Sequence, residues 1–169
     1  MHFGAMGTSY RISAVLAVAA LCAFPPLGTL YARTPQRAEA QPCKAITNKI
    51  LSTTNAHFEQ FSELGTRVLF EHPFARDLSL SCTSPEKIGV YVRWDAAEPP
   101  AAFFDLATKA GVATTGELMS TLGMAIRNCH RAALQGRTEF AATETPMSKI
   151  ECQAFTREGG GTSVSVWVK

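Results

Sequence analysis

The sequence has few charged side chains and lacks the short motifs that mark common enzyme active sites. Charged residues make up 18% and hydrophobic residues 46% of the 169 positions, a balance that excludes disorder along the whole chain. No G-x-S-x-G, H-E-x-x-H, Walker loop or dinucleotide fingerprint is present. The glycine run Gly159–Gly161 precedes a predicted strand, so it lacks the helix N-terminus that binds phosphate and is interpreted as a hairpin turn. These absences favour a non-enzymatic protein and predict no cofactor.

The sequence also lacks a run of basic residues. Its 16 basic and 14 acidic side chains give a formal net charge of +2. The first forty residues hold three of the basic and one of the acidic side chains, which leaves 13 of each sign in residues 41–169. A neutral region of this kind gives no electrostatic reason to expect nucleic acid or an anionic membrane as partner.

No apolar run is long enough for a typical membrane span, which needs about 20 residues. The longest, Ile12–Phe24, follows a basic residue and ends at two prolines, a pattern typical of a secretory signal. We expect residues 1–40 to be this signal, with cleavage after Ala40 or Ala32. The alternative is an uncleaved anchor extending to about Tyr31. Both interpretations make residues 41–169 a single exported domain, periplasmic or secreted, and the first leaves no membrane span after cleavage.

The exported domain has four cysteines but no CxxC or CxxH spacing, and the closest two are 23 positions apart. In an oxidising compartment such cysteines form structural disulfides, so neither a metal site nor redox chemistry is predicted. Four cysteines allow three pairings. We favour Cys43–Cys82 with Cys129–Cys152, because each pair would tie a helix to a strand. The alternative joins Cys43 to Cys129 and Cys82 to Cys152.

Three segments have helical periodicity. The first is predicted over Cys43–Leu64, and a short second helix opens after Pro99-Pro100 and ends near Gly111. The third runs from Thr114 to Gly136, where Thr114 and Glu117 form a capping-box start. An apolar stripe on this helix includes Cys129 and points it toward the core.

Six segments alternate apolar and polar residues and predict strands: residues 67–71, 78–82, 88–94, 138–143, 149–156 and 162–169. The order is helix, three strands, two helices, three strands. This order predicts an α+β fold with a largely antiparallel sheet of about six strands in two groups of three. Three helices would pack on one face of the sheet, and the disulfides would staple them to it.

The same alternation predicts a second, open face of the sheet. If the valines of residues 88–94 and 162–169 face the helices, a different set points away from them: Tyr91, Arg93, Gln153, Phe155, Ser165 and Trp167. Aromatic and arginine side chains are enriched at protein-binding hot spots. We therefore take Tyr91, Arg93, Phe155 and Trp167 as the candidate binding face of a non-enzymatic binding or inhibitor module. Its partner would be a protein or a cell-envelope component.

Two other functions remain open on the sequence. A periplasmic hydrolase without a recognisable motif would need His57, His72 or His130 beside a carboxylate in a cleft. A carrier of a small apolar ligand would need a sizeable pocket between the helices and the sheet.

Overall fold

The computed structural model describes residues 41–84, 87–157 and 159–169, so the expected signal and its cleavage sites lie outside the described residues. The elements follow one another as α1 (Gln41–Thr54), β1 (His57–Phe61), β2 (Arg67–His72), β3 (Ala75–Cys82), β4 (Ile88–Trp94), α2 (Ala101–Thr115), α3 (Met119–Gln135), β5 (Phe140–Glu144), β6 (Ser148–Ala154) and β7 (Thr162–Val168). The predicted α+β class is confirmed.

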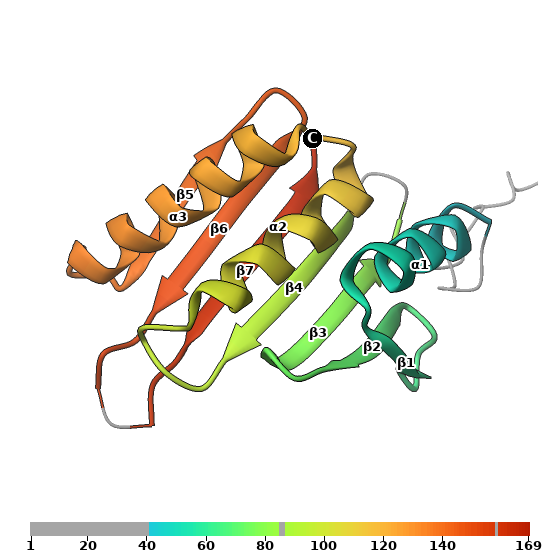
Figure 1. The fold of residues 1–169 in the computed structure, drawn as a ribbon, viewed down its shortest axis with the longest axis horizontal. Coiled ribbons are helices and arrows are strands. Elements are labelled where there is room, and N and C mark those ends of the chain that lie inside the picture. Colours follow the sequence, from blue (N-terminus) through green and yellow to red (C-terminus); the bar gives the residue numbers. More distant parts are fainter. Residues whose placement is uncertain (1–40, 85–86, 158) are drawn as a thin grey trace, which may run out of the picture. The chain divides into compact units, whose positions relative to one another are not determined.

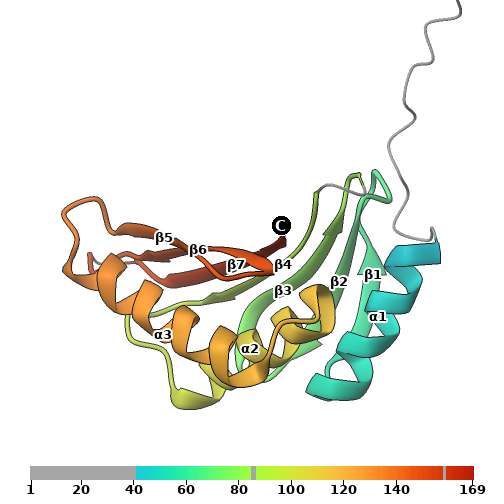
Figure 2. The same ribbon diagram turned by 90° about the horizontal axis from the view of Figure 1, so that it is seen from above.

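The seven strands form one antiparallel sheet in the order β1-β2-β3-β4-β7-β6-β5. The pairing of β4 with β7 joins an N-terminal set of four strands to a C-terminal set of three (Figure 1). The sheet is therefore continuous and has one strand more than expected, in place of two groups of three. Seen along its edge, the sheet has all three helices on the same side (Figure 2).

The predicted first helix, Cys43–Leu64, is wrong beyond Thr54. The Thr54 hydroxyl donates to the carbonyl of Ile50 at 2.7 Å and accepts the N–H of Ala56 at 3.2 Å. Asn55 then turns the chain with a φ of 58°, a conformation that ends a helix. The aromatic residues that seemed to continue the helical face lie instead on the edge strand β1, where all five side chains are exposed.

The boundary between α2 and α3 also differs from the prediction. Helix α2 passes through Gly111 and ends four residues later, at Thr115, and the next residue, Gly116, caps it with a φ of 75° and an N–H bond to the carbonyl of Val112. Thr114 is thus the penultimate residue of α2 and not a capping-box start. Gly111 is needed for close packing, because an added Cβ there would lie 2.7 Å from Cδ2 of Leu122.

The inner face of the sheet and the helices share one core of buried aliphatic side chains, the largest of which include Leu78, Leu80, Val90, Val92, Leu122, Ile126, Ile150, Val164 and Val166. Both favoured disulfides are confirmed. Cys43–Cys82 links α1 to β3 across a Cα–Cα distance of 6.2 Å, and Cys129–Cys152 links α3 to β6 across 5.9 Å. Within the described part of the chain, no helix is long and apolar enough to cross a membrane.

Candidate binding site on the open face of the sheet

The sheet register places small side chains across the middle of the open face. Partners across neighbouring strands share one face of a sheet. One such row comprises Ser79, Tyr91, Ser165 and Glu151, and the next comprises Asp77, Arg93, Ser163 and Gln153. Within these rows Ser165 and Ser163 of β7 lie between larger side chains of β4 and β6, so the face is low along β7.

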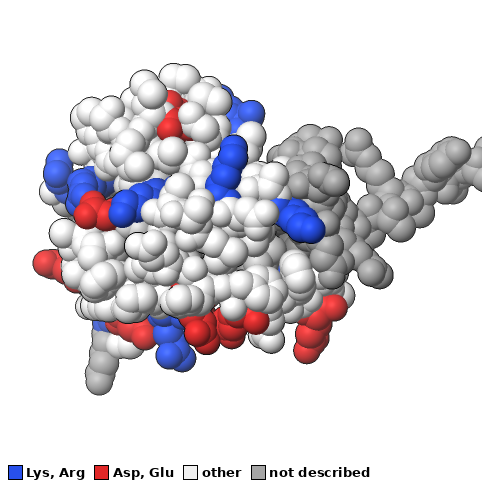
Figure 3. All heavy atoms as spheres, turned by 45° about the vertical axis from the view of Figure 1, so that its right-hand side comes forward, with Lys and Arg blue, Asp and Glu red and all other residues white. Residues whose placement is uncertain are grey.

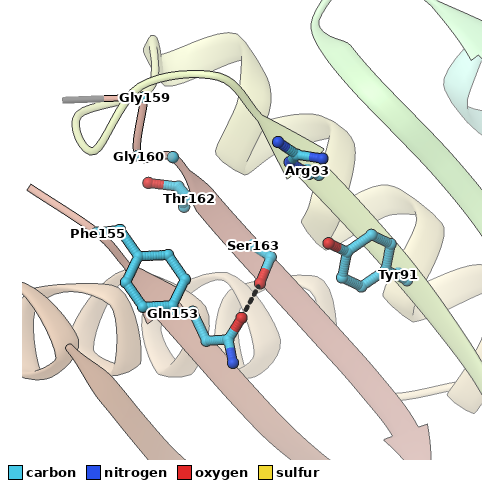
Figure 4. Close-up of a pocket in the computed structure, with 9 residues that line it drawn as sticks. Tyr91, Arg93, Gln153, Phe155, Gly159, Gly160, Thr162 and Ser163 are labelled. Carbon is cyan, nitrogen blue, oxygen red and sulfur yellow. Dashed lines mark hydrogen bonds between the residues drawn. The ribbon is translucent and has the colours of Figure 1, made fainter. Parts of the chain in front are cut away.

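A hollow of about 210 Å³ lies at one end of this face. Its walls come from β4, from β6 and the residue after it, and from the turn into β7: Tyr91, Arg93, Gln153, Phe155, Gly159, Gly160, Gly161, Thr162 and Ser163. Figure 4 shows the side chains of Tyr91, Gln153 and Phe155 around that of Ser163, with Arg93 at the upper rim. Three of the four residues predicted for the binding face therefore line one hollow.

Arg93 is the charged residue of the hollow, and two carboxylates hold it in place. Its Nη1 lies 3.5 Å from Oδ2 of Asp77, the residue opposite it on β3, and its Nη2 lies 3.7 Å from Oδ1 of Asp95. The three side chains are 45%, 51% and 62% exposed, so these ion pairs contribute little to stability. Both distances exceed the 2.7–2.9 Å or so of a strong charge-assisted bond, which leaves the guanidinium N–H groups able to bind a ligand.

The neutral polar groups of the hollow present both donors and acceptors. The Ser163 hydroxyl donates to Oε1 of Gln153 at 3.2 Å (dashed in Figure 4). This bond occupies the amide oxygen of Gln153 and leaves its NH₂ group without a partner among the described residues. The Tyr91 hydroxyl likewise has no hydrogen-bond partner there, and the Phe155 ring supplies an apolar wall.

The glycine run forms the predicted turn, here between β6 and β7, for reasons of backbone packing. An added Cβ at Gly160 would overlap the carbonyl of Phe155, and one at Gly161 would lie 2.5 Å from the carbonyl oxygen of Trp94. Gly159 has a φ of 71°, which few other residues adopt. The turn is closed by a bond of 2.9 Å from the Phe155 N–H to the Gly161 carbonyl.

Trp167, the fourth predicted residue, is on the same face but outside the hollow. It pairs with Gly89 across the β4–β7 ladder, and a Cβ at Gly89 would overlap its indole ring. The indole therefore covers the glycine backbone, a packing role that accounts for its position. Trp167 also lines a separate depression with charged neighbours that include Lys87, Glu144, Lys149 and Glu151.

The three histidines lie at two separate places in the fold. His130 is buried, and its Nε2 lies 2.9 Å from the Ala97 carbonyl oxygen and 3.3 Å from Oγ1 of Thr162. His57 and His72 share a hollow beside the β1 edge with Glu59 and Glu71. Within the described residues, no histidine forms an ion pair with a carboxylate, and no three His, Cys, Asp or Glu side chains are grouped to hold a metal.

The helix side carries an exposed surface that the sequence reasoning missed. Met119, Met124 and Met147 are 50%, 63% and 47% exposed, and the first two line a groove of about 490 Å³ between α2 and α3. The signal in the sequence is that Met119 and Met124 lie off the apolar stripe of α3. Seen obliquely from this side, the charged groups are separated by wide uncharged areas (Figure 3).

The arrangement on the open face is suited to binding. The hollow combines a guanidinium, an amide and two aromatic side chains, and its serine hydroxyl has no histidine partner among the described residues. Between the helices and the sheet, the buried hydrophobic side chains form one core. Comparison of the chain with family models, with curated proteins and with solved structures finds no match in any of the three.

Proposed function

We propose that this protein is a small exported binding or inhibitor module that captures a protein or another cell-envelope component through the open face of its sheet. The observation that carries the proposal is the hollow in which Tyr91 and Arg93 of β4 meet Phe155 beyond the end of β6. Aromatic and arginine side chains around a partly enclosed pocket are typical of the centre of a protein interface.

The size of the hollow favours a large partner. At about 210 Å³ it is smaller than the roughly 300–1,000 Å³ of pockets that enclose small ligands. It is large enough to receive a side chain of a partner that rests on the surrounding face. The small side chains of Ser163 and Ser165 on β7, between β4 and β6, leave room for such a partner to approach the strands.

Export is part of the proposal and is supported by the two disulfides, which form and persist in oxidising compartments. It is tested by mass spectrometry of the protein recovered from the periplasm or medium. A mature N-terminus at Gln41 or Arg33 is expected. Recovery only from the cytoplasm, with reduced thiols, would contradict export.

The binding face is tested with Phe155→Ala and Arg93→Gln in cross-linking capture from the native cell envelope. We expect each substitution to abolish or strongly reduce the cross-linked species while leaving the unfolding temperature within a few degrees of that of the unmodified protein. Arg127→Gln is the matched control, because Arg127 pairs with Asp105 on the helix layer at 2.8 Å. Undiminished capture by both face variants would refute the proposal.

Trp167 is left out of this test for a structural reason. Its indole covers Gly89, so truncation would disturb the β4–β7 seam and confound a loss of binding with a loss of fold.

A further inference from the structure

We infer that the hollow receives an acidic side chain of the partner, presented next to an apolar residue, with the carboxylate bound by Arg93. The inference rests on the proposed function and specifies the chemistry of the partner at that site. It follows from the unused hydrogen-bonding groups of the hollow and from the nature of its walls.

The unused groups of the hollow are mostly donors. Arginine has five N–H groups in a planar fork, and the two neighbouring carboxylates approach Arg93 no closer than 3.5 and 3.7 Å. The NH₂ of Gln153 is oriented by the bond that its oxygen accepts from Ser163. That NH₂ group lies on the side of the amide away from Arg93 (Figure 4), so the guanidinium alone is the charged donor of the hollow. A group that binds it must be an acceptor, and a carboxylate matches the guanidinium fork best.

The acidic groups around the hollow do not cancel this preference. Asp77 and Asp95 are more than half exposed, where water screens their charge. Glu151, in the neighbouring row, is paired with Lys149 at 2.9 Å. A second guanidinium, that of Arg157, lies 4.9 Å from the centroid of the Phe155 ring and adds positive charge at the opposite wall.

The walls account for the apolar neighbour of the carboxylate. Tyr91 and Phe155 bring their rings to the hollow from different strands, and Figure 4 shows both beside Ser163. Burial of an aromatic or aliphatic group against these rings supplies the non-directional part of the affinity. The charge of Arg93 then selects for an acidic group beside it.

The experiment uses three capped peptides, Ac-Gly-Phe-Glu-Gly-amide and its Gln and Lys counterparts, titrated into the oxidised, exported protein and followed by amide chemical shifts. We expect the Glu peptide to shift resonances of the strands around the hollow. Its dissociation constant should be about tenfold below that of the Lys peptide, because the guanidinium of Arg93 attracts the carboxylate of one peptide and repels the ammonium of the other.

Variants then assign the preference to the hollow. In Arg93→Gln the Glu and Lys peptides should bind alike, whereas Arg127→Gln should keep the tenfold preference. Three results would overturn the inference: no shift with any peptide, equal binding of the Glu and Lys peptides, or a preference that survives in Arg93→Gln. If one of these is found while Phe155→Ala still abolishes capture of the native partner, the proposed function stands and only the acidic ligand is wrong.

Discussion

The two disulfides hold helices that are attached to the sheet in different ways. Helix α3 packs along β5 and β6, so Cys129–Cys152 reinforces a contact that side chains already make. Helix α1 has α2 as its main neighbour, and Cys43–Cys82 is its covalent link to β3. Figures 1 and 2 show this arrangement, with α2 over the middle of the sheet, α3 over β5 and β6, and α1 at the β1 edge. The same type of bond therefore reinforces direct helix–sheet packing in one half, whereas in the other it ties to the sheet a helix that packs mainly on α2.

This difference predicts that loss of Cys43–Cys82 detaches α1. By the relation between loop length and chain entropy, the bond contributes about 3.9 kcal/mol for its separation of 39 residues. Cys43→Ala with Cys82→Ala should lower the free energy of unfolding by an amount of this order. In addition to this global destabilisation, helix α1 should open locally, so the amides of Gln41–Thr54 should exchange with solvent much faster than those of β3. Hydrogen exchange read by mass spectrometry measures both regions in one experiment.

The matched variant is Cys129→Ala with Cys152→Ala. Its separation of 23 residues gives about 3.4 kcal/mol, so the global loss should be nearly the same. The amides of α3 should nevertheless stay protected relative to those of β6, because the helix keeps its side-chain contacts. If the amides of α1 in the first variant and those of α3 in the second exchanged equally fast, the two helices would depend on their disulfides to the same extent.

The pairing of β4 with β7 joins the two halves of the sheet, and it depends on Gly89, over which the Trp167 indole lies. Gly89→Ala should destabilise the protein by about 1–3 kcal/mol, because the new methyl group overlaps the ring. Chemical denaturation measures the loss. Adding Trp167→Ala should recover part of the loss caused by the methyl group, a coupling that a double-mutant cycle detects.

Gly123→Ala is the control for the glycine substitution. An added Cβ there meets Thr108 at 3.4 Å, an ordinary contact, and alanine favours the helix by roughly 0.8–1.0 kcal/mol over glycine. The two substitutions should therefore change stability in opposite directions. If Gly89→Ala left the free energy of unfolding unchanged, the indole of Trp167 could accommodate the added methyl group and the absence of a side chain at Gly89 would not be required.

The contrast between local and distant interactions also explains what the sequence could reveal. Alternation correctly assigned the inner faces of β3, β4, β6 and β7, because side-chain direction in a strand is a local property. It failed at Phe58 and Phe61, whose spacing fits a helix although they lie exposed on an edge strand. It failed again at Gly111, which looked like a helix stop but allows α2 to approach Leu122.

The candidate site shows the same limit. Alternation placed Tyr91, Arg93 and Trp167 on one face, but only the register of β4 with β7 separates Trp167 from the other two. That register joins segments about seventy positions apart and is set by the whole sheet. The overlap of Trp167 with Gly89 and the closure of the turn at Gly161 were beyond reach for the same reason.

In the C-terminal half, Glu117 ties the turn between α2 and α3 to the β5–β6 hairpin. Its carboxylate accepts the Thr145 hydroxyl at 2.6 Å and the N–H of Met147 at 3.0 Å, and the Thr145 bond is the largest cause of its lowered pKa. A carboxyl with a lowered folded-state pKa adds stability above its unfolded value of 4.5, and this is lost as the pH falls through the folded value. Glu117→Gln should lower stability at neutral pH and flatten the decline below pH 4.5, as thermal unfolding across pH 2–7 would show.

Glu144→Gln, in the same hairpin, is the control for this carboxylate. The pKa of Glu144 is also lowered, mainly by the hydrogen bond and charge of Lys169, but both side chains are about half exposed. Its effect on the acid branch should be smaller than that of Glu117, since water screens an exposed pair. If Glu144→Gln changed the decline below pH 4.5 more than Glu117→Gln does, the pair of Glu144 with Lys169 would be the main acid-sensitive contact of this half.

The smallest effect on the pH dependence of stability is expected from His72, a titratable residue with a lowered pKa in the N-terminal half. Its Nδ1 accepts the N–H of Phe74 at 3.1 Å, and burial is the main cause that lowers its pKa, with smaller contributions from the charges of Lys109 and His57 and an opposing bond to the Thr54 backbone. As the pH falls below 6.5, the ordinary pKa of histidine, His72 becomes protonated in the unfolded chain while it stays neutral in the folded protein. Stability should therefore be complete above pH 6.5 and decline on acidification until the folded-state pKa is passed. His72→Asn, which keeps an acceptor for Phe74 but does not titrate, should remove this decline between pH 7.5 and 5, whereas Glu117→Gln should leave it intact. If stability still declined between pH 7.5 and 5 in His72→Asn, a titratable group other than His72 would cause the decline.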